Sequence, residues 1–357
     1  MANITHPLES SPSDPNGGFA RIAAQLPSPT MLWFLGLLSL PAILFDRLEV
    51  LNGFALFFLF GFWPFVRGFL ESVRPTEESV NPADWINTDD DRSVIIRANI
   101  AMILMMFQPI VSGIGLLQMM GQIPMALRYR WDLPTPETYE SSVEYRLPFE
   151  GTWTVVNGSP DQRHSHSWGI LTQRYAHDFV MTDDAGQTHN GERSGPDAHY
   201  CFGEPILAPA SGTVVTARDG HRDYHRTDGR VDPLQRHLLG NYVVIEHADG
   251  EYSMLAHLQQ GSVSVSENER VEQGDRIGRC GNSGNSTEPH LHFHIQDRPN
   301  FFLGMGLPVR FDDIEIKLPN EEPTHKETGY VHAGQMVASG NMEQAERTIE
   351  SIETRRQ

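Results

Sequence analysis

Hydrophobic and polar positions divide this chain of 357 residues into two parts of different character. The first part contains three windows without charged side chains, at residues 31–45, 50–66 and 100–121. Each window approaches the length of about 20 residues that an α-helix needs to cross the hydrocarbon of a bilayer. We therefore predict an α-helical transmembrane region over residues 27–127, preceded by a tail of residues 1–26.

Two alternatives to three membrane spans stay open. Gln108 and Pro109 weaken the third window, so a two-span hairpin followed by a buried helix is the second arrangement. The first window could also be a signal peptide, but only Arg21 precedes it and no small-residue cleavage site separates it from the next window. With three spans, Arg21 and the arginine-rich loop after the second window share the cytoplasmic side. We therefore expect a multi-pass protein of the cell membrane whose larger, C-terminal part lies outside the cell.

Short apolar runs that alternate with polar residues fill the second part, over residues 144–317. Runs of this length, separated by Gly, Pro, Asn and Asp, are typical of an antiparallel β-sandwich or open barrel. An Asp-Gly pair at 249–250 is a strong hairpin signal, and the polar stretch 221–239 predicts a long loop that faces a substrate. We predict a mainly β domain over 144–317 and a polar C-terminal tail over 318–357, with one helix at 342–354.

The charge of the chain excludes one class of partner. There are 46 Asp and Glu against 27 Lys and Arg, which gives a net charge of −19. A protein that binds nucleic acid needs a basic surface, so we expect no nucleic-acid partner. Only Lys317 and Lys326 are lysines, and an acidic, lysine-poor composition resembles that of salt-adapted proteins, as from a halophilic archaeon. The two cysteines, Cys201 and Cys280, are too few for a disulfide scaffold, and the sequence leaves their pairing open.

The candidate chemistry lies among the 16 histidines. His290, His292 and His294 are spaced by two positions, so in a β-strand they share one face while the apolar residues between them face the core. A His-x-His pair on a strand can supply one metal ligand and a neighbouring base. A further histidine, His257, lies in an earlier short apolar run. The pattern predicts a metal site on one face of the β domain.

At these positions the chain resembles the lysostaphin-type (LytM-type) zinc endopeptidases, which cut peptide cross-links in bacterial cell walls. The resemblance covers about residues 147–317 and does not include the apolar windows. It rests on segments in the family's order: APASGTV (208–214), GNYVVIEH (240–247), AHL (256–258), VEQGDRIG (271–278) and PHLHF (289–293). It implies the duplicated hybrid motif fold, one zinc ion (Zn²⁺) per chain and a peptide of the cell envelope as the substrate.

The resemblance also implies roles for individual residues. His292 matches the zinc-binding second histidine of His-x-His, and Asp178, in the segment RYAHDF, matches the zinc-binding aspartate. His290 and His257 match the two catalytic histidines. The usual family spacing places the first zinc histidine four residues before the aspartate, where this chain has Arg174. Because an arginine cannot ligate zinc, the first ligand must come from elsewhere.

Three histidines remain candidates for this first zinc ligand. His164 and His166 lie 14 and 12 residues before Asp178, and a loop can return either of them to the site. His177 adjoins Asp178, but neighbouring strand positions face opposite ways. We favour His166 as the third ligand beside Asp178 and His292, with His164 as the next candidate.

Together these residues predict a membrane-anchored zinc metalloendopeptidase, with a cell-envelope peptide and the lipid bilayer as its partners. A metal-activated water would hydrolyse the peptide bond, with His257 and His290 as the proton-transferring groups. The alternative is a catalytically inactive relative that binds and regulates an envelope partner, and Arg174 motivates it. A carbohydrate-phosphotransfer carrier is disfavoured by the membrane windows and by Asp178. We expect His294 to tune the site from behind the metal ligands.

Overall fold

The computed structural model describes residues 33–39, 42, 45–62, 82–87, 100, 108–165, 167–191, 195–248 and 250–340. The chain forms two compact units, residues 1–79 and 80–357. In the first unit two 3-10 helical segments are described, η1 (Trp33–Ser39) and η2 (Asp46–Phe62). They overlap the first two apolar windows, and apolar side chains such as Leu56 are exposed along them.

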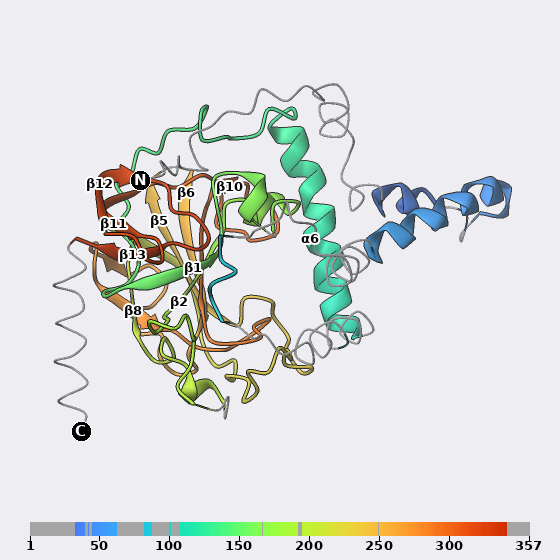
Figure 1. Ribbon diagram of the computed structural model, residues 1–357. Coiled ribbons are helices and arrows are strands. Elements are labelled where there is room, and N and C mark those ends of the chain that lie inside the picture. Colours follow the sequence, from blue (N-terminus) through green and yellow to red (C-terminus); the bar gives the residue numbers. More distant parts are fainter. Residues whose placement is uncertain are drawn as a thin grey trace, which may run out of the picture. The chain divides into compact units, whose positions relative to one another are not determined.

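The second unit is built on an antiparallel sheet of 11 strands (Figure 1). Its strands are β1 (Trp153–Asn157), β2 (His177–Val180), β4 (Gly212–Arg218), β5 (Asn241–Ala248), β6 (Glu251–Leu258), β7 (Arg270–Val271), β9 (Leu291–Gln296), β10 (Gly306–Leu307), β11 (Phe311–Lys317), β12 (Thr324–Gly329) and β13 (Met336–Ser339). The order along the sheet is β12-β11-β13-β1-β2-β9-β6-β5-β4-β7, and β10 pairs with β9. A second sheet pairs β3 (Pro205–Leu207) with β8 (Arg276–Arg279). The prediction of a mainly antiparallel β domain is confirmed.

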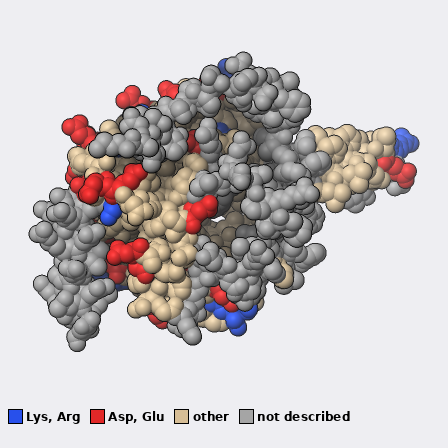
Figure 2. Space-filling view, viewed as in Figure 1, with Lys and Arg blue, Asp and Glu red and all other residues tan. Residues whose placement is uncertain are grey.

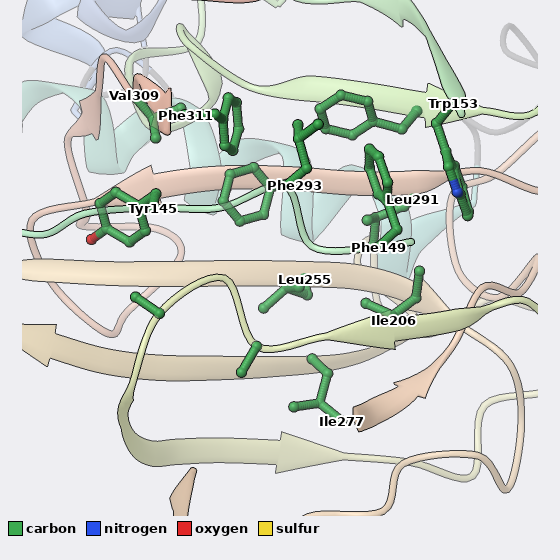
Figure 3. Packing of buried hydrophobic residues seen from close by; sticks show 14 of the residues in the cluster. Tyr145, Phe149, Trp153, Ile206, Leu255, Ile277, Leu291, Phe293, Val309 and Phe311 are labelled. Carbon is green, nitrogen blue, oxygen red and sulfur yellow. The ribbon is translucent and has the colours of Figure 1, made fainter. Parts of the chain in front are cut away.

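The main hydrophobic core contains one face of β9. Leu291, Phe293 and Ile295 are each buried in it, at alternate positions of the strand. Ile206 of β3 and Ile277 of β8 belong to the same core, which therefore lies between the two sheets (Figure 3). Each such side chain stabilises the fold by about 1.5–3 kcal/mol through burial. Because successive residues of a strand face opposite ways, the polar residues of β9 are directed to the other face of the large sheet.

The hairpin predicted at residues 249–250 is present. β5 and β6 pair with Ala248 opposite Glu251. The polar stretch 221–239 precedes β5, and its described residues form no helix or longer strand. Its last residue contacts the end of β6, since the Leu239 carbonyl accepts a hydrogen bond from the backbone N–H of His257 at 3.0 Å. The loop therefore ends next to a predicted catalytic residue.

The helix α6 (Pro109–Arg128) overlaps the third apolar window, belongs to the second unit and contacts the rest of that unit through its more polar side. Gln122 Oε1 accepts from the backbone N–H of Leu171 at 3.2 Å, and Arg128 forms an ion pair of 2.6 Å with Asp297. The outward side is apolar, with Leu116, Leu117, Met120, Ile123 and Leu127 exposed. Among the described residues, α6 alone is long and apolar enough to cross a membrane by length and composition. Core helices of soluble proteins can have the same length and composition.

Three short 3-10 helices lie in the connections between the strands: η3 (Gln162–His164), η4 (Leu171–Gln173) and η5 (Pro196–Ala198).

The thiols Cys201 and Cys280 are both free and buried, and Cys201 Sγ donates to the Pro289 carbonyl at 3.2 Å. The two cysteines therefore form no disulfide here.

The second unit, called the β unit from here on, extends further along the chain than the sequence predicts. Residues 318–357 read as a polar tail, yet β12 and β13 lie within this segment and both pair with β11, while β13 also pairs with β1. β12 carries almost only exposed polar residues, because it is the edge strand and packs little of its surface. Its sequence therefore lacks the alternation that reveals a half-buried strand. The helix predicted at 342–354 lies outside the described residues.

Two glycines allow the loops beside His257 to approach one another. Gly240 has φ +61° and Gly284 has φ +77°, a left-handed conformation that favours glycine. A Cβ on Gly240 would lie 2.4 Å from the carbonyl carbon of Ser283, and one on Gly284 would lie 2.3 Å from the Gly240 nitrogen. Neither position has room for a side chain.

We expect Gly240→Ala to destabilise the β unit by more than backbone strain alone. Gly250 is the matched control, because it has φ +80° and open space around its Cα. Alanine in the left-handed region costs about 1–2 kcal/mol, and overpacking at Gly240 adds about 1–3 kcal/mol. Urea denaturation of both variants measures the difference, and equal free energies of unfolding would contradict the close packing of the two loops.

Candidate functional site

The candidate site is a row of residues across four neighbouring strands. Strand pairing sets Asn157 of β1 opposite Asp178 of β2, Asp178 opposite His292 of β9, and His292 opposite Ala256 of β6. Asp178 and His292 are 114 positions apart in the sequence and meet because β2 and β9 pair. The row lies on the face of β9 that points away from Phe293 and the main core.

Asp178 and His292 face each other at hydrogen-bond distance. His292 Nδ1 lies 2.8 Å from Asp178 Oδ1, and the second carboxylate oxygen accepts a hydrogen bond of 2.9 Å from Asn157 Nδ2. Both predicted metal ligands are largely buried, with exposed fractions of 8% for Asp178 and 7% for His292. The carboxylate is therefore held from behind by an amide, while its other oxygen is directed at the imidazole.

His294 and Gln296 continue the polar face of β9 behind His292. His292 Nε2 lies 3.1 Å from His294 Nδ1, and His294 Nε2 lies 2.9 Å from Gln296 Oε1. Burial lowers the pKa of His294 to about 3, so its ring is neutral at physiological pH. The predicted role of His294 behind the ligands thus has a geometric basis. Sequence reasoning missed Gln296, although the period of two that links His290, His292 and His294 continues to it.

His257 reaches the same face through a break in the alternation of β6. Leu255 and Leu258 both lie in the main core, while Ala256 lies in the cluster on the opposite face. His257 has φ +61°, an uncommon conformation for a residue other than glycine. We infer that this left-handed residue turns the His257 ring to the side of Ala256. Burial, followed by the nearby rings of His290 and His292, lowers the pKa of His257 well below its usual value.

His290 lies at the start of β9 and completes the group of rings. The ring centroids of His257 and His290 are 4.7 Å apart, and those of His257 and His292 are 5.8 Å apart. His290 Nε2 lies 3.8 Å from Asp178 Oδ1, and its side chain keeps an exposed fraction of 16%. The structure thus brings together four of the five predicted site residues.

Backbone carbonyls determine which nitrogen the two predicted catalytic histidines present. His257 Nδ1 lies 2.8 Å from the Ser283 carbonyl, and His290 Nδ1 lies 2.9 Å from the Glu288 carbonyl. A carbonyl only accepts hydrogen bonds, so each Nδ1 carries a proton. In the neutral ring Nε2 then keeps its lone pair. Both side chains can accept a proton at Nε2 and, once protonated, donate it to a developing negative charge.

His177 lies on the other side of β2 and is excluded as a ligand of the same ion. Its ring stacks on Phe179 at 5.8 Å, and its Nε2 lies 3.3 Å from the Val331 carbonyl. It is buried, and this burial lowers its pKa to about 4. The expectation that neighbouring strand positions face opposite ways is therefore met, and His177 is a neutral core residue.

The fifth predicted residue, His166, lies outside the described residues. Its two neighbours are anchored close to β2, because Ser165 Oγ donates to the Arg174 carbonyl at 3.1 Å and Ser167 Oγ donates to the Gln173 carbonyl at 2.9 Å. The guanidinium of Arg174 lies 4.9 Å above the Trp168 ring. Desolvation lowers the pKa of Arg174.

The donors that do converge suit zinc. Asp178 Oδ1 and His292 Nδ1 are an oxygen and a nitrogen 2.8 Å apart, and zinc binds both atom types at about 2.0–2.2 Å in a tetrahedral arrangement. Their other polar atoms are bonded to Asn157 and His294, as is usual for metal ligands. No group of three His, Cys, Asp or Glu that could hold a metal occurs in the part of the chain that the structure describes.

The central part of the β unit matches the model of one known family. The profile of Peptidase family M23 matches residues 191–302, a range that contains His257, His290 and His292 and begins after Asp178. These residues carry the signature of an M23 (LytM-type) peptidase domain.

Similar proteins include both an endopeptidase and a regulator. The chain is 35% identical over 106 residues to the peptidoglycan DD-endopeptidase ShyA of Vibrio cholerae, a match that covers 29% of this chain and 24% of that protein. It is 30% identical over 132 residues to the murein hydrolase activator NlpD of Salmonella dublin, covering 37% and 30%. The chain thus spans about a quarter of the length of the first curated relatives it matches. A crystal structure of a zinc containing peptidase from Vibrio cholerae has 21% identity and a TM-score of 0.28, covering 46% of this chain and 41% of that one.

The buried neutral histidines predict that acid destabilises the metal-free protein. Unfolding lets His177 take up a proton below its unfolded pKa of 6.5, whereas the folded protein resists this down to about pH 4. The free energy of unfolding therefore falls as the pH is lowered through this window, by about 1.4 kcal/mol per pH unit for one proton.

The variant His177→Gln keeps a donor for the Val331 carbonyl but cannot titrate. We expect the slope of the free energy of unfolding between pH 4 and 6.5 to decrease by one proton in this variant. Urea denaturation in the presence of a chelator at several pH values measures the slope. An unchanged slope would show that His177 is not held neutral.

Proposed function

We propose that the M23-type domain of this chain is a zinc metalloendopeptidase that hydrolyses peptide bonds in the cell envelope. The observation that carries the proposal is the convergence of Asp178 Oδ1 and His292 Nδ1 at 2.8 Å, with the rings of His257 and His290 alongside. We assign Asp178, His292 and His166 as the zinc ligands. The anchoring of Ser165 and Ser167 beside β2 supports His166, because it restrains both neighbours of that residue.

The ion would supply one part of the chemistry. Zinc held by three protein ligands keeps an open position, acts as a Lewis acid on a carbonyl and lowers the pKa of a bound water to near 7. Asn157 holds one oxygen of the Asp178 carboxylate, so that the other stays directed at His292 and would be available to a bound ion. These contacts hold the ligands in place before substrate binds, which limits the reorganisation that the reaction needs.

His257 and His290 carry the proton transfers. Each ring is held by a backbone carbonyl at Nδ1 and presents Nε2 to the site. One Nε2 accepts the proton of the attacking water, and a protonated ring then stabilises the oxyanion and returns a proton to the leaving amine. The partial exposure of His290 places it where a substrate can enter, whereas His257 lies deeper.

The charge of the protein bears on the substrate. In Figure 2 acidic side chains are scattered over the described surface, with few basic ones among them, as the net charge of −19 leads us to expect. Acidic surfaces keep a protein soluble and repel acidic polymers. We therefore expect uncharged or basic peptides near the scissile bond, and the lysine-poor composition points to work in a salty medium.

A second candidate function is an inactive domain that regulates an envelope partner. Arg174 favours it, because it occupies the position where the first zinc ligand usually lies and its guanidinium stacks on Trp168. The two functions differ in whether the purified protein holds stoichiometric zinc and cleaves peptides.

We expect the site residues to separate into metal ligands and proton-transfer residues. His292→Ala and His166→Ala should weaken zinc binding by more than the roughly 10–100-fold that loss of an outer contact costs. His290→Ala should keep its zinc and lower kcat/KM about 10²–10⁴-fold. Competition with a chromogenic chelator measures the affinity in the detergent-solubilised full chain, and a peptide library measures turnover at low and high salt.

His164→Ala is the matched control for His166→Ala, because both histidines lie in the same segment. It should leave zinc affinity unchanged. Zinc loss in His164→Ala but not in His166→Ala would reassign the third ligand, and absence of stoichiometric zinc in the wild type would favour the regulator. Equal zinc loss in His290→Ala and His292→Ala would refute the division of roles.

We further propose that the apolar windows anchor the chain in the membrane and that the M23-type domain lies outside the cell. The support is compositional: the windows at 31–45, 50–66 and 100–121 contain no charged side chain, and arginines gather on the expected cytoplasmic side. α6 is long and apolar enough to serve as one span.

Lysine labelling tests this location. The chain has two lysines. Lys317 is the last residue of β11, and Lys326 lies in the edge strand β12, where it is exposed. A membrane-impermeant amine reagent added to intact cells should modify Lys326. Modification only after cell lysis would place the domain in the cytoplasm, and Lys326→Arg supplies the background.

A further inference from the structure

We propose that His294 and Gln296 are positioning residues that set the proton of His292 on Nε2 and leave Nδ1 free to bind the metal. They form a buried chain of hydrogen bonds that begins at the Arg298 carbonyl and ends at His292. The inference rests on the proposed zinc site and adds to it a reason why one nitrogen of His292, and not the other, is the ligand.

The direction of the chain is set at its far end. Gln296 Nε2 donates to the Arg298 carbonyl at 2.6 Å. A carbonyl accepts hydrogen bonds only, so the amide nitrogen must lie on that side and Oε1 must face His294. His294 Nε2, 2.9 Å from Oε1, is therefore the donor in the next hydrogen bond.

The same reasoning then assigns the proton on each of the two imidazole rings. With one proton on each ring, the His294 proton is on Nε2, so its Nδ1 accepts. The partner at 3.1 Å is His292 Nε2, which must then donate. The remaining nitrogen, His292 Nδ1, carries a lone pair and faces Asp178 Oδ1 at 2.8 Å.

Two acceptors facing each other at this distance repel unless a cation or a proton lies between them. Asp178 cannot turn away, because Asn157 Nδ2 holds its second oxygen. The chain of hydrogen bonds from Arg298 to His292, which we call the relay, therefore leaves one nitrogen and one oxygen facing each other as acceptors. Such a pair is ready to bind a positive ion. An orienting partner on the second nitrogen of a ligating histidine also raises the basicity of the first.

The chain is built into a tightly packed part of the fold. His294 and Gln296 have no exposed surface, and the apolar residues Met254 and Phe301 flank the His294 ring. A Cβ on Gly304 would lie 2.9 Å from Gln296 Cδ and 3.2 Å from the Arg298 carbonyl oxygen. Glycine at this position thus allows the amide of Gln296 to reach the carbonyl.

Burying the polar side chains of His294 and Gln296 costs desolvation free energy. Apolar residues at the same positions would not have this cost. An apolar face on β9 behind His292 would pack against Met254 and Phe301 without any hydrogen bonds. Polar residues in this place are therefore explained by the orientation that they impose on His292, and not by the stability of the sheet.

Two substitutions of Gln296 test the direction of the relay in the full chain. Gln296→Met removes the acceptor for His294 at similar size, whereas Gln296→Glu keeps an acceptor for His294 and replaces the amide that donates to Arg298 by a carboxyl group. We expect the zinc dissociation constant to rise about 10–100-fold in Gln296→Met and to stay within about threefold of the wild type in Gln296→Glu. Gln335→Met, at a buried glutamine whose Oε1 accepts from the His332 backbone, controls for loss of a buried amide.

A second readout does not depend on zinc turnover. With ¹⁵N-labelled histidine, nuclear magnetic resonance of the detergent-solubilised chain should find His294 protonated on Nε2 in the wild type and in Gln296→Glu, and a mixture of tautomers in Gln296→Met. Gly304→Ala should act like Gln296→Met, since it displaces the amide without changing any relay residue.

The outcomes separate this proposal from the zinc site itself. If the wild type binds zinc, His292→Ala loses it and Gln296→Met binds as tightly as the wild type, the relay is overturned and the zinc site stands. If the wild type binds no zinc, the proposed function fails, and the tautomer of His294 still decides the direction of the relay. A His294 proton on Nδ1 in the wild type would contradict the relay in either case.

Discussion

The pairing of β2 with β9 is the constraint on which the site depends. It sets Asp178 directly opposite His292, although the two residues are 114 positions apart. A shift of β9 by one residue against β2 would turn Phe293 to the site and His292 into the core, so Asp178 would lose its partner. The apolar positions of β9 prevent such a shift, because Leu291, Phe293 and Ile295 are all buried in one core. Packing on one face therefore secures the chemistry on the other.

The remaining groups are placed by departures from regular strand geometry. His257 joins the site because it adopts a left-handed conformation at the end of β6, a strain of about 1–3 kcal/mol that the surrounding contacts must offset. Its ring is held by the Ser283 carbonyl, and the loop that supplies this carbonyl approaches Gly240 too closely for a side chain. Core packing, two glycines and one strained residue thus act together to group three imidazoles, two of which lie within 4 Å of the Asp178 carboxylate.

The sequence predicts the parts of this arrangement that follow a local period or a short motif. The spacing of two in β9 identifies His292 and its face, and the motif resemblance leads to Asp178, His257 and His290. Neither the spacing nor the resemblance identifies Asn157. Its role arises from the pairing of β1 with β2, a contact that no local sequence pattern reveals. The sequence also does not reveal β12, since an exposed edge strand has no alternation, or β13, which has four residues. Hydropathy predicts the apolar window that contains α6. It does not predict the hydrogen bond between the Leu171 backbone N–H and Gln122 Oε1, which attaches α6 to the rest of the β unit.

We propose that one zinc ion joins Asp178 Oδ1 to His292 Nδ1. Crystals of the zinc-loaded protein, measured on both sides of the zinc absorption edge, test it most directly. We expect a single strong anomalous peak within about 2.0–2.2 Å of both atoms, with His166 as the third protein ligand. A peak bonded to His292 Nε2, a peak at other histidines, or no peak at a saturating zinc concentration would contradict it.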